Sequence, residues 1–529
     1  MKLDAKQLTD RFNQLSQERI TWESHWQDLA DYILPNKNEI QRINTPGEKR
    51  NLKLFDSTAQ QSNELLAGAL HGMLTSPSSI FFGLSTGDPK IDERDDVRKF
   101  FAEATRRIHQ VLNNSNFQTE MHEVYLDLAC FGTATMIISE DDKDLIRFSA
   151  RQISEVFVAE NNRGSIDVVY RKFKWDARQI AQEFGESNLH KNVKEALDKG
   201  DCRKFTIVHA VYPMELNIEN KVFKYHSQYL LLDEKHIISE GKMREFPYIV
   251  SRWSKGSGEI YGRSPGMTAL PDIKMINEVM KTTIRGAQKT VDPPLMLPDD
   301  GMVMPIVTKP GGLNFYRAGT TDKIETFAND ARIDFGFQVL EDMRLRIRQA
   351  FFIDQLQLNQ GPQMTATEVM QRTEEKMRLL GPMLGRQQSE LLRPLIDRIF
   401  DVCLKKGVIS EEEIPEILSD RKLDVQYSSL IAKAQRSAEV QTILRTLESV
   451  ANIAQFDPTA LDNFDANETV RYIAKMTDYP QELIRDSDEI EQLRQARAQQ
   501  QQMIQEQQMQ SAKLENAQKV ADVSNKLKK

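Results

Sequence analysis

Four basic side chains follow one side of a predicted helix in the middle of the chain. They are Lys274, Lys281, Arg285 and Lys289. At about 100° per residue they form a stripe well separated from the apolar stripe of the same helix, Ile273, Ile276, Met280, Ile284 and Ala287. One side of the helix is therefore expected to pack, while the other could neutralise phosphate groups. A solvated basic face on an ordinary helix has the same pattern, so spacing alone leaves both interpretations open.

A second pattern, within residues 359–403, concerns how a helix begins and bends. With Thr365 as the N-cap, Glu368 occupies position N3 and completes a capping box. Gly381 and Pro382 lie inside the apolar repeat that follows. Proline has no backbone N–H and collides with the carbonyl one turn earlier, so a helix crossing this pair must kink or end there. A core helix hairpin broken at Gly-Pro would also explain the pattern.

A serine hydrolase motif is matched by sequence but not by chemistry. Residues 262–266, "GRSPG", fit G-x-S-x-G with Ser264 as the nucleophile. The oxyanion hole needs the backbone N–H of the next residue, and Pro265 has none. All 8 histidines also precede Ser264, whereas in these hydrolases the catalytic histidine follows the serine. A hydrolase is therefore disfavoured.

Other enzyme signals are equally weak. "GSGEIYG", residues 256–262, is too long for a dinucleotide fingerprint, and no Walker sequence occurs. "HEVYL", beginning at His122, lacks the second histidine of a zinc protease. No carboxylate pair or His/Cys cluster is singled out by its spacing. We therefore expect no enzyme activity, no cofactor and no metal.

Composition limits the remaining classes. A chain of 529 residues should contain two to four domains. A net charge of −8 and a pI near 5.7 argue against tight nucleic-acid binding, which needs a clearly basic domain. Weak, sliding contact with DNA remains compatible with this charge.

Cellular location is indicated by what the sequence lacks. Cys130, Cys202 and Cys403 are far apart, as expected of a reducing compartment and unlike a disulfide scaffold or zinc ribbon. No apolar stretch approaches the ~18 residues of a membrane helix, and the first residues have no apolar signal core. We expect a soluble protein made in the cytoplasm that does not enter a membrane.

The elements that must position these residues follow from periodicity. Helices are predicted over 4–34, from a Ser57/Gln60 capping box onward, and over 95–112 and 117–130. Between about 145 and 253 the period approaches two, which predicts an α+β domain. Its strand candidates are 155–160, 165–175, 204–212, 221–232 and 248–253; a hairpin turn is predicted at 161–164, and short helices at 176–184 and 189–197.

The second half is predicted to be mostly helical. Two helices, about 272–290 and 332–350, enclose a Pro- and Gly-rich insertion. After Gly407 helices dominate, including 466–476 and a long run from about Pro480. Residues 499–510 contain 8 Gln in 12, which favours an exposed helix fading into a mobile tail.

In order along the chain, these phrases resemble the portal, or head-to-tail connecting, proteins of short-tailed phages. The resemblance rests on "LFDSTAQQSNELLAGALHGMLTSP", "YGRSPGMTALPDIKMINE", "DPPLMLP", "MTATEVMQRTEE" and "LGPMLGRQQSELLRPLIDR", and covers about residues 5–410. It implies an α+β, predominantly α-helical portal fold assembled as a ring, commonly of twelve subunits. The ring would occupy one vertex of the capsid in the virion and let double-stranded DNA enter and leave.

The resemblance also implies a place for each segment. Residues 1–265 would form the wing, 266–290 the first stem helix, 291–328 the clip, 329–352 the second stem helix, 353–364 a channel loop, 365–430 the kinked wing helix with its return segment, and 431–529 the crown with the Gln-rich tail. The loop's polar side chains offer hydrogen bonds without a base code, as a sequence-blind channel requires: Gln355, Gln357, Asn359, Gln360 and Gln363.

Implied partners are other copies of the chain, the large terminase subunit, tail or adaptor proteins, and the major capsid and scaffolding proteins. With no Walker sequence here, the partner would have to power DNA movement. The competing interpretation is a helical scaffold or adaptor without a DNA channel. A C-terminal coiled coil would favour it, although the heptads there are poor.

Overall fold

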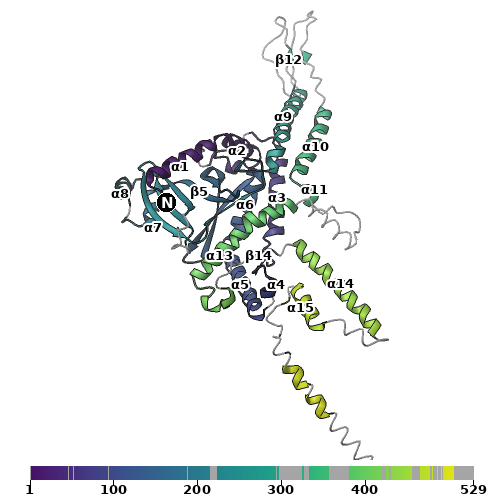
Figure 1. Ribbon diagram of the computed structural model, residues 1–529. Helices are drawn as coiled ribbons and strands as arrows, with labels where there is room; N and C mark the ends of the chain where they lie inside the picture. Colours follow the sequence, from purple (N-terminus) through teal and green to yellow (C-terminus); the bar gives the residue numbers. More distant parts are fainter. Residues whose placement is uncertain are drawn as a thin grey trace, which may run out of the picture. The chain divides into compact units, whose positions relative to one another are not determined.

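The protein is described by a computed structural model (Figure 1). It describes residues 2–43, 45, 47–51, 53–92, 94–187, 189–214, 223–292, 295–296, 325–326, 333–356, 381–418, 424–427, 430–454, 465–476, 479, 485, 490, 492–497 and 499–504. The chain forms two compact units, residues 1–82 with 106–411, and residues 83–105 with 412–529.

The first unit mixes helices and antiparallel sheets. Its helices are α1 (Ala5–Glu18), α2 (Ile20–Tyr32), η1 (Pro35–Lys37), α3 (Thr58–Leu74), α6 (Phe117–Phe131), η2 (Ile153–Glu155), α7 (Ala177–Phe184), α8 (Lys191–Asp198), α9 (Pro265–Val291), α10 (Ile333–Ala350), α11 (Ile353–Leu356), η3 (Gln388–Leu392) and α13 (Arg393–Lys405). Its strands are β2 (Thr133–Asp141), β3 (Leu145–Arg151), β4 (Val156–Glu160), β5 (Ile166–Asp176), β6 (Lys204–Pro213), β7 (Tyr225–Leu231), β8 (His236–Met243), β9 (Tyr248–Arg252), β10 (Ser254–Lys255), β11 (Gly262–Arg263), β12 (Leu295–Met296) and β13 (Glu325–Thr326).

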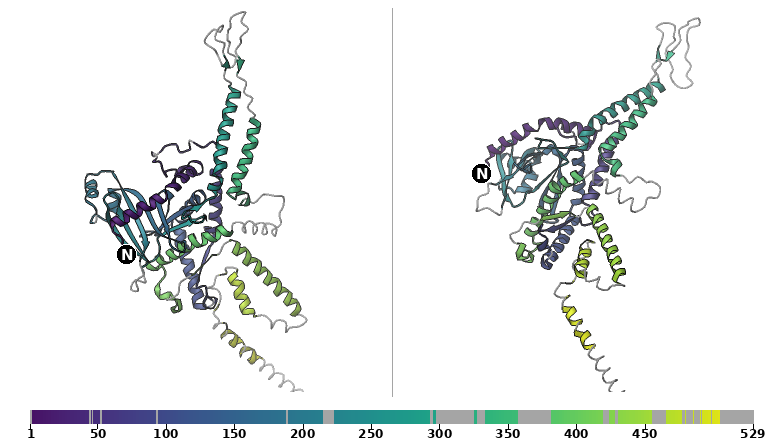
Figure 2. Two further views of the ribbon diagram at one scale, coloured as in Figure 1. Left: turned by 45° about the horizontal axis from the view of Figure 1, so that its top comes forward. Right: turned by 45° about the vertical axis from the view of Figure 1, so that its right-hand side comes forward.

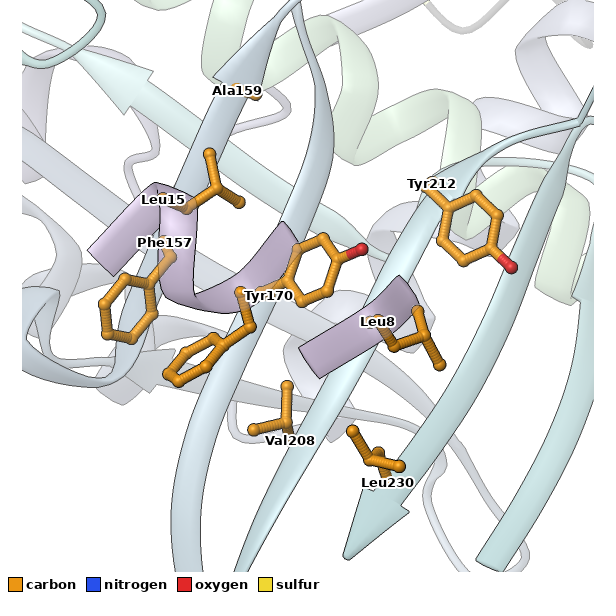
Figure 3. Packing of buried hydrophobic residues seen from close by; sticks show 10 residues of the cluster. Leu8, Leu15, Phe157, Ala159, Tyr170, Val208, Tyr212 and Leu230 are labelled. Atoms are coloured by element: carbon orange, nitrogen blue, oxygen red, sulfur yellow. The ribbon is translucent and has the colours of Figure 1, made fainter. Parts of the chain in front are cut away.

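A five-stranded sheet in the order β4-β5-β6-β7-β8 provides the main core of this unit. Side chains alternate across it, so Val208 and Ala210 of β6 face α1 while Ile207 faces α7 and α8. Helix α1 lies across one side of the sheet and packs its apolar residues against Phe157, Tyr170 and other sheet residues (Figure 3). Burying each such side chain contributes about 1.5–3 kcal/mol. Both sides of the sheet are therefore covered.

Arg19 lies between α1 and α2 and contacts the chain at the entrance to β4. Its guanidinium donates to the carbonyl oxygens of Ile153 (2.8 Å), Ser154 (2.9 Å) and Val156 (2.5 Å), and it pairs with Glu23 at 2.8 Å. Of these carbonyl groups, that of Val156 belongs to the edge strand β4, and those of Ile153 and Ser154 belong to the turn η2 that precedes it. The prediction of one helix over 4–34 is wrong at Arg19, where the chain instead breaks into two helices.

Two glycines bring α6 and β11 into direct backbone contact. Gly132 ends α6 with φ +76°, and a Cβ there would lie 2.5 Å from the carbonyl oxygen of Gly262. A Cβ on Gly262 would lie 2.2 Å from the carbonyl oxygen of Gly132. Neither position can carry a side chain, because the two backbones would have to separate. The start of α9, three residues after Gly262, is thereby placed against the end of α6.

A buried arginine, Arg252 at the end of β9, joins three parts of the first unit. Its guanidinium donates to Glu390 Oε1 at 2.8 Å, to Glu160 Oε2 at 3.0 Å and to the carbonyls of Gly164 (2.8 Å) and Ile260 (3.2 Å). Burial acts to lower the pKa of Arg252, but the hydrogen bonds and charges of Glu390 and Glu160 outweigh it and raise the pKa. The side chain is therefore a fully paired buried cation.

Glu390 reaches Arg252 from a π-helical turn, η3, which the sequence analysis did not predict. The backbone N–H of Arg393 donates to the carbonyl of Gln388, five residues earlier. Pro394 follows and lacks the N–H that would bond to Glu390 in a regular helix, so a wider turn relieves the mismatch. Gln387, just before η3, accepts from Ser251 and donates to the carbonyl of Arg252.

The helix predicted to bend at Gly381-Pro382 is described from this pair onward. Residues 381–387 are helical, but 357–380 lie outside the described residues. The capping box of Thr365 and Glu368 lies there too. Cap and kink therefore remain predictions.

The second unit contains β1 (Phe82–Ser85), α4 (Pro89–Asp92), the first part of α5 (Asp95–Asn114), η4 (Glu411–Glu413), η5 (Glu416–Leu418), β14 (Asp424–Tyr427), α14 (Leu430–Ala454) and α15 (Ala466–Met476). Strand β14 pairs with β1 although more than 300 residues separate them along the chain. Tyr472 of α15 bonds to Glu439 of α14 at 3.3 Å. The mostly helical prediction after Gly407 is therefore correct for α14 and α15 and wrong for β14.

Other local predictions have mixed outcomes. The helices at 95–112, 117–130, 176–184, 189–197 and 466–476 are confirmed, as are five strands and the turn at 161–164. Strands β2, β3 and β8 were missed. Ser57 is the N-cap of α3 as predicted, but the capping box is wrong, because its side chain makes no cap bond and Asp56 Oδ1 instead accepts from the N–H of Thr58 at 2.9 Å.

Buried His209 on β6 makes stability depend on pH. Its ring nitrogens bond to Tyr248 (2.7 Å) and Ser227 (2.9 Å), and its ring stacks on Tyr229 at 4.0 Å. Burial, followed by the charge of Arg171, lowers the pKa of His209 from 6.5 to about 3. The unfolded chain then binds more protons between these values, so stability is full above pH 6.5 and is lost as pH falls toward 3.

We expect this histidine to remove about 2 kcal/mol of stability between pH 7 and pH 5. Urea unfolding at the two pH values would measure the loss in the natural protein and in a His209→Gln variant, which cannot titrate. The other histidines are present in both proteins, so the difference between the two stability losses isolates the contribution of His209. Equal pH slopes in the two proteins would contradict the assignment.

Candidate nucleic-acid interface

Helix α9, which carries the basic stripe, begins at a buried serine cap. Ser264 Oγ accepts from the N–H of Met267 at 2.9 Å and donates to the carbonyl of Cys130 at 2.7 Å. Pro265 occupies the first helical position, where a missing N–H costs nothing. The serine of the G-x-S-x-G match is thus used as a helix cap tied to the end of α6, and it is not free to act as a nucleophile.

Helices α9 and α10 form an antiparallel hairpin that projects from the rest of the first unit, which we call the body. They lie side by side in both views of Figure 2. Near the base, Ile273 and Ile276 of α9 and Ile347 of α10 are buried. Farther out, Ile284 of the same apolar stripe is exposed. The predicted packing face is therefore confirmed for the base of the hairpin and not for its outer half.

The basic stripe lies on the side of α9 away from α10. The side facing α10 is marked by Thr283, since a Cβ on Gly336 of α10 would lie 2.9 Å from Thr283 Oγ1. Lys281 and Arg285 are each two residues from Thr283, and two residues turn a helix by about 200°. The stripe therefore faces outward from the hairpin, where another molecule can reach it.

Two of the four stripe cations already have carboxylate partners. Lys274 Nζ lies 2.7 Å from Asp28 of α2, and Lys281 Nζ lies 3.1 Å from Glu278. The Lys281–Glu278 spacing of three residues was a visible signal of this pair that the sequence analysis did not use. The Lys274–Asp28 pair joins positions 246 residues apart, so local pattern could not reveal it.

Unlike Lys274 and Lys281, the stripe cations Arg285 and Lys289 have no carboxylate partner among the described residues. Both side chains are exposed, and neither makes a hydrogen bond or ion pair with the residues that the structure describes. They lie on the outer half of α9, beyond the paired lysines. The free positive charge of the stripe is therefore concentrated at the far end of the helix.

A histidine near the base adds no charge at neutral pH. His25 of α2 lies within electrostatic reach of both Lys274 and Arg263. Burial, then the charge of Arg263, lowers its pKa, which keeps the ring neutral. The electrostatics of the stripe thus depend on its lysine and arginine side chains.

The predicted polar loop is only partly described. Gln355 belongs to α11; its side-chain oxygen is shielded from solvent and has no hydrogen-bond partner among the described residues. Gln357, Asn359, Gln360 and Gln363 lie outside the described residues. Their part in an interface with DNA stays a prediction.

The described residues show neither a cluster of metal ligands nor a membrane-spanning helix. Within the described part of the chain, no three His, Cys, Asp or Glu side chains come together as metal ligands would. None of the described helices is long and apolar enough to cross a membrane.

Comparison with known proteins identifies the family. Residues 5–484 match the family described as "Bacteriophage head to tail connecting protein". The chain belongs to this family of phage connectors. The match covers both compact units of the connector chain, including the α9–α10 hairpin and most of the C-terminal helices.

Relatives with curated names agree with the family. The connector chain is 31% identical over 517 residues to a "Probable portal protein" of Bordetella phage BPP-1, covering 95% of this chain and 93% of that protein. It is 28% identical to the "Portal protein" of Salmonella phage epsilon15, covering 98% and 96%. A "Portal protein" of Enterobacteria phage T3 is 20% identical, covering 84% and 83%.

Proposed function

We propose that this connector is a portal protein that assembles as a ring, commonly of twelve copies, at one vertex of the capsid. The ring encloses a channel through which double-stranded DNA enters during packaging and leaves during ejection. The family and the names of the relatives support the portal role. The observation that carries the ring is the set of apolar side chains exposed on the hairpin.

The exposed apolar side chains occur on both helices of the hairpin. Their exposed fractions are 54% for Met275, 39% for Ile284, 86% for Val291, 52% for Phe337 and 48% for Leu345. Apolar residues gathered on a projecting element usually mark a contact surface. If α9 of one copy lies against α10 of the next around the ring, each copy presents a different surface from the one that it meets. Such heterologous contacts close into a ring when the rotation between copies closes.

The DNA channel is supported by the charge on α9. Arg285 and Lys289 are the stripe cations that have no hydrogen bond or ion pair among the described residues, and each copy in a ring repeats them. The whole chain carries a net charge of −8, so the contact with phosphate would be local and weak rather than a strong trap. A channel through which DNA slides needs this combination.

The remaining segments take the places of a portal subunit. The body up to about residue 265 is the wing, α9 and α10 are the stem, 291–328 is the clip, 353–364 the channel loop and 431–529 the crown. The clip, outside the capsid, contacts the large terminase during packaging and the tail or adaptor proteins afterwards. The wing and crown contact the major capsid and scaffolding proteins.

Negative-stain imaging with native mass determination tests the ring directly. Closed rings with a central hole wide enough for duplex DNA, about 20 Å, would support the proposal. Monomers or rods, even at high protein concentration, would overturn it and favour a helical scaffold or adaptor.

Two point variants and a truncation separate the ring from the adaptor. We expect Phe337→Glu to reduce the ring fraction at least tenfold, because a charge would be buried at each subunit contact. Ile20→Glu, at a similarly exposed residue of α2, is the matched control and should still form rings. Truncation at residue 480 should leave rings intact, whereas an adaptor held together by a C-terminal coiled coil should fall to monomers.

A further inference from the structure

Both helices of the hairpin are held at one level by the short segment before α3. Asn277 of α9 is buried, and its Oδ1 accepts from the backbone N–H of Phe55 at 2.7 Å and of Asp56 at 3.1 Å. Its Nδ2 donates to the carbonyl of Ile273, one turn earlier, at 2.8 Å. The amide is thus fully oriented, and it fixes α9 to the backbone of residues 55–56.

Asp56 makes the corresponding contact with α10. Its Oδ2 accepts from Arg344 Nε at 3.0 Å and from Arg344 Nη2 at 2.8 Å, while its Oδ1 accepts from the N–H of Thr58 at 2.9 Å. The carboxylate is buried. Burial acts to raise the pKa of Asp56, but the hydrogen bonds from Thr58 and Arg344 outweigh it and lower the pKa. Asp56 is therefore a charged group held between α3 and α10.

These contacts lie where the hairpin leaves the body. On α9, Ile276 beside Asn277 is buried, whereas Ile284 two turns farther is exposed. On α10, Met343 beside Arg344 is buried, whereas Phe337 two turns farther out is exposed. Just beyond this level the hairpin contacts the body once more, where Lys281 Nζ lies 5.9 Å from the centre of the Phe55 ring.

The outer half of the hairpin behaves as one unit. A Cβ on Gly336 of α10 would lie 2.9 Å from Thr283 Oγ1 of α9, so the two helices approach closely at this level. Helices packed at this distance transmit a displacement from one to the other. A change at the base would therefore turn the whole hairpin rather than slide one helix along its partner.

We infer that Asp56 is a positioning residue that sets the angle between the α9–α10 hairpin and the body. Asn277 holds α9 through backbone groups and acts as the pivot, and the Asp56–Arg344 ion pair holds α10 and fixes the angle. The angle would govern channel width only if the proposed portal function is correct. The contacts themselves concern a single chain and can be tested without DNA.

The test measures the angle as a distance between two spin labels by pulsed electron resonance. One label is attached to Cys202, the exposed cysteine, since Cys130 and Cys403 are buried. The second is attached after a Lys289→Cys change near the far end of α9. Labelled full-length chain is diluted with unlabelled chain so that only distances within one chain are measured.

Asp56→Asn and Arg344→Met should each at least double the width of the distance distribution. Arg344→Met leaves the Asp56–Thr58 bond in place, so it remains informative if Asp56→Asn fails to fold. Glu341→Gln is the matched control, because it removes the other carboxylate partner of Arg344, at 2.6 Å, and leaves Asp56 untouched. It should keep the natural distribution.

A lower melting temperature with an unchanged distance distribution in both variants would overturn the inference and leave Asp56 as a cap for α3. Ring formation in the same samples is scored separately. A broadened distribution in the variants supports the positioning role whether or not those variants form rings. Monomers of the chain with natural Asp56 and Arg344 would count against the proposed portal ring alone.

Discussion

Replacing Arg252 by methionine is expected to lower the free energy of unfolding of the first unit by about 3–5 kcal/mol. Methionine keeps much of the side-chain volume but removes the cation between Glu390 and Glu160. Both carboxylates are mostly enclosed, and each would lose its bonds to the guanidinium without regaining full hydration, although Lys255 would still pair with Glu160 and Arg386 with Glu390. The helix that contains η3 would lose its main polar contact with β9.

Thermal unfolding followed by near-ultraviolet circular dichroism would measure this effect. A loss of this size corresponds to roughly 10 °C for a unit of several hundred residues. Arg263→Met is the control, because Arg263 is half exposed and its pair with Glu259 should contribute no more than about 1 kcal/mol. Equal shifts in the two variants would show that Arg252 has no special role.

Reversing the two unpaired stripe cations is expected to block DNA packaging while leaving the ring intact. In the Arg285→Glu, Lys289→Glu variant every subunit would present two carboxylates where it now presents two cations. Repetition around the ring multiplies the repulsion of phosphate, and we expect packaged DNA to fall more than about tenfold. Lys281 is left unchanged in this variant, since altering it would also break its pair with Glu278.

DNase-protected DNA per capsid is the measurement. Lys194→Glu with Lys199→Glu, at exposed lysines in α8 and at its C-cap, makes the same change in net charge away from the hairpin and is the matched control. Normal packaging by the hairpin variant, with rings present, would remove α9 from the DNA channel. Equal losses in both variants would indicate an effect of net charge alone.

Long amphipathic elements were predictable because their periodicity is local. Residues 95–112 and 466–476 repeat apolar side chains every three or four positions, and both form helices. Strands such as β5 and β6 combine β-branched residues with a period near two. Strand β14 could not be found in this way, because its partner β1 lies more than 300 residues earlier.

For the candidate interface, the sequence predicted the helix and the stripe but not the state of each cation. An i to i+3 pair such as Lys281–Glu278 can be inferred from spacing, while Lys274–Asp28 requires two distant helices to meet. Buried polar residues that join distant segments, such as Arg252, Asp56 and Asn277, resemble ordinary surface residues in the sequence. Burial singled them out, and burial is a property of the assembled fold.

Local pattern therefore determined the helices and most strands of the five-stranded sheet, and whole phrases of sequence were enough to indicate the connector family. Tertiary structure decided which charges remain free, where the hairpin leaves the body and what holds it there. The physical reason is that helices and strands follow from neighbouring residues, whereas desolvation and ion pairing depend on groups brought together from distant parts of the chain. Arg285 and Lys289 became the strongest candidates for phosphate contact only after the carboxylate partners of Lys274 and Lys281 were known.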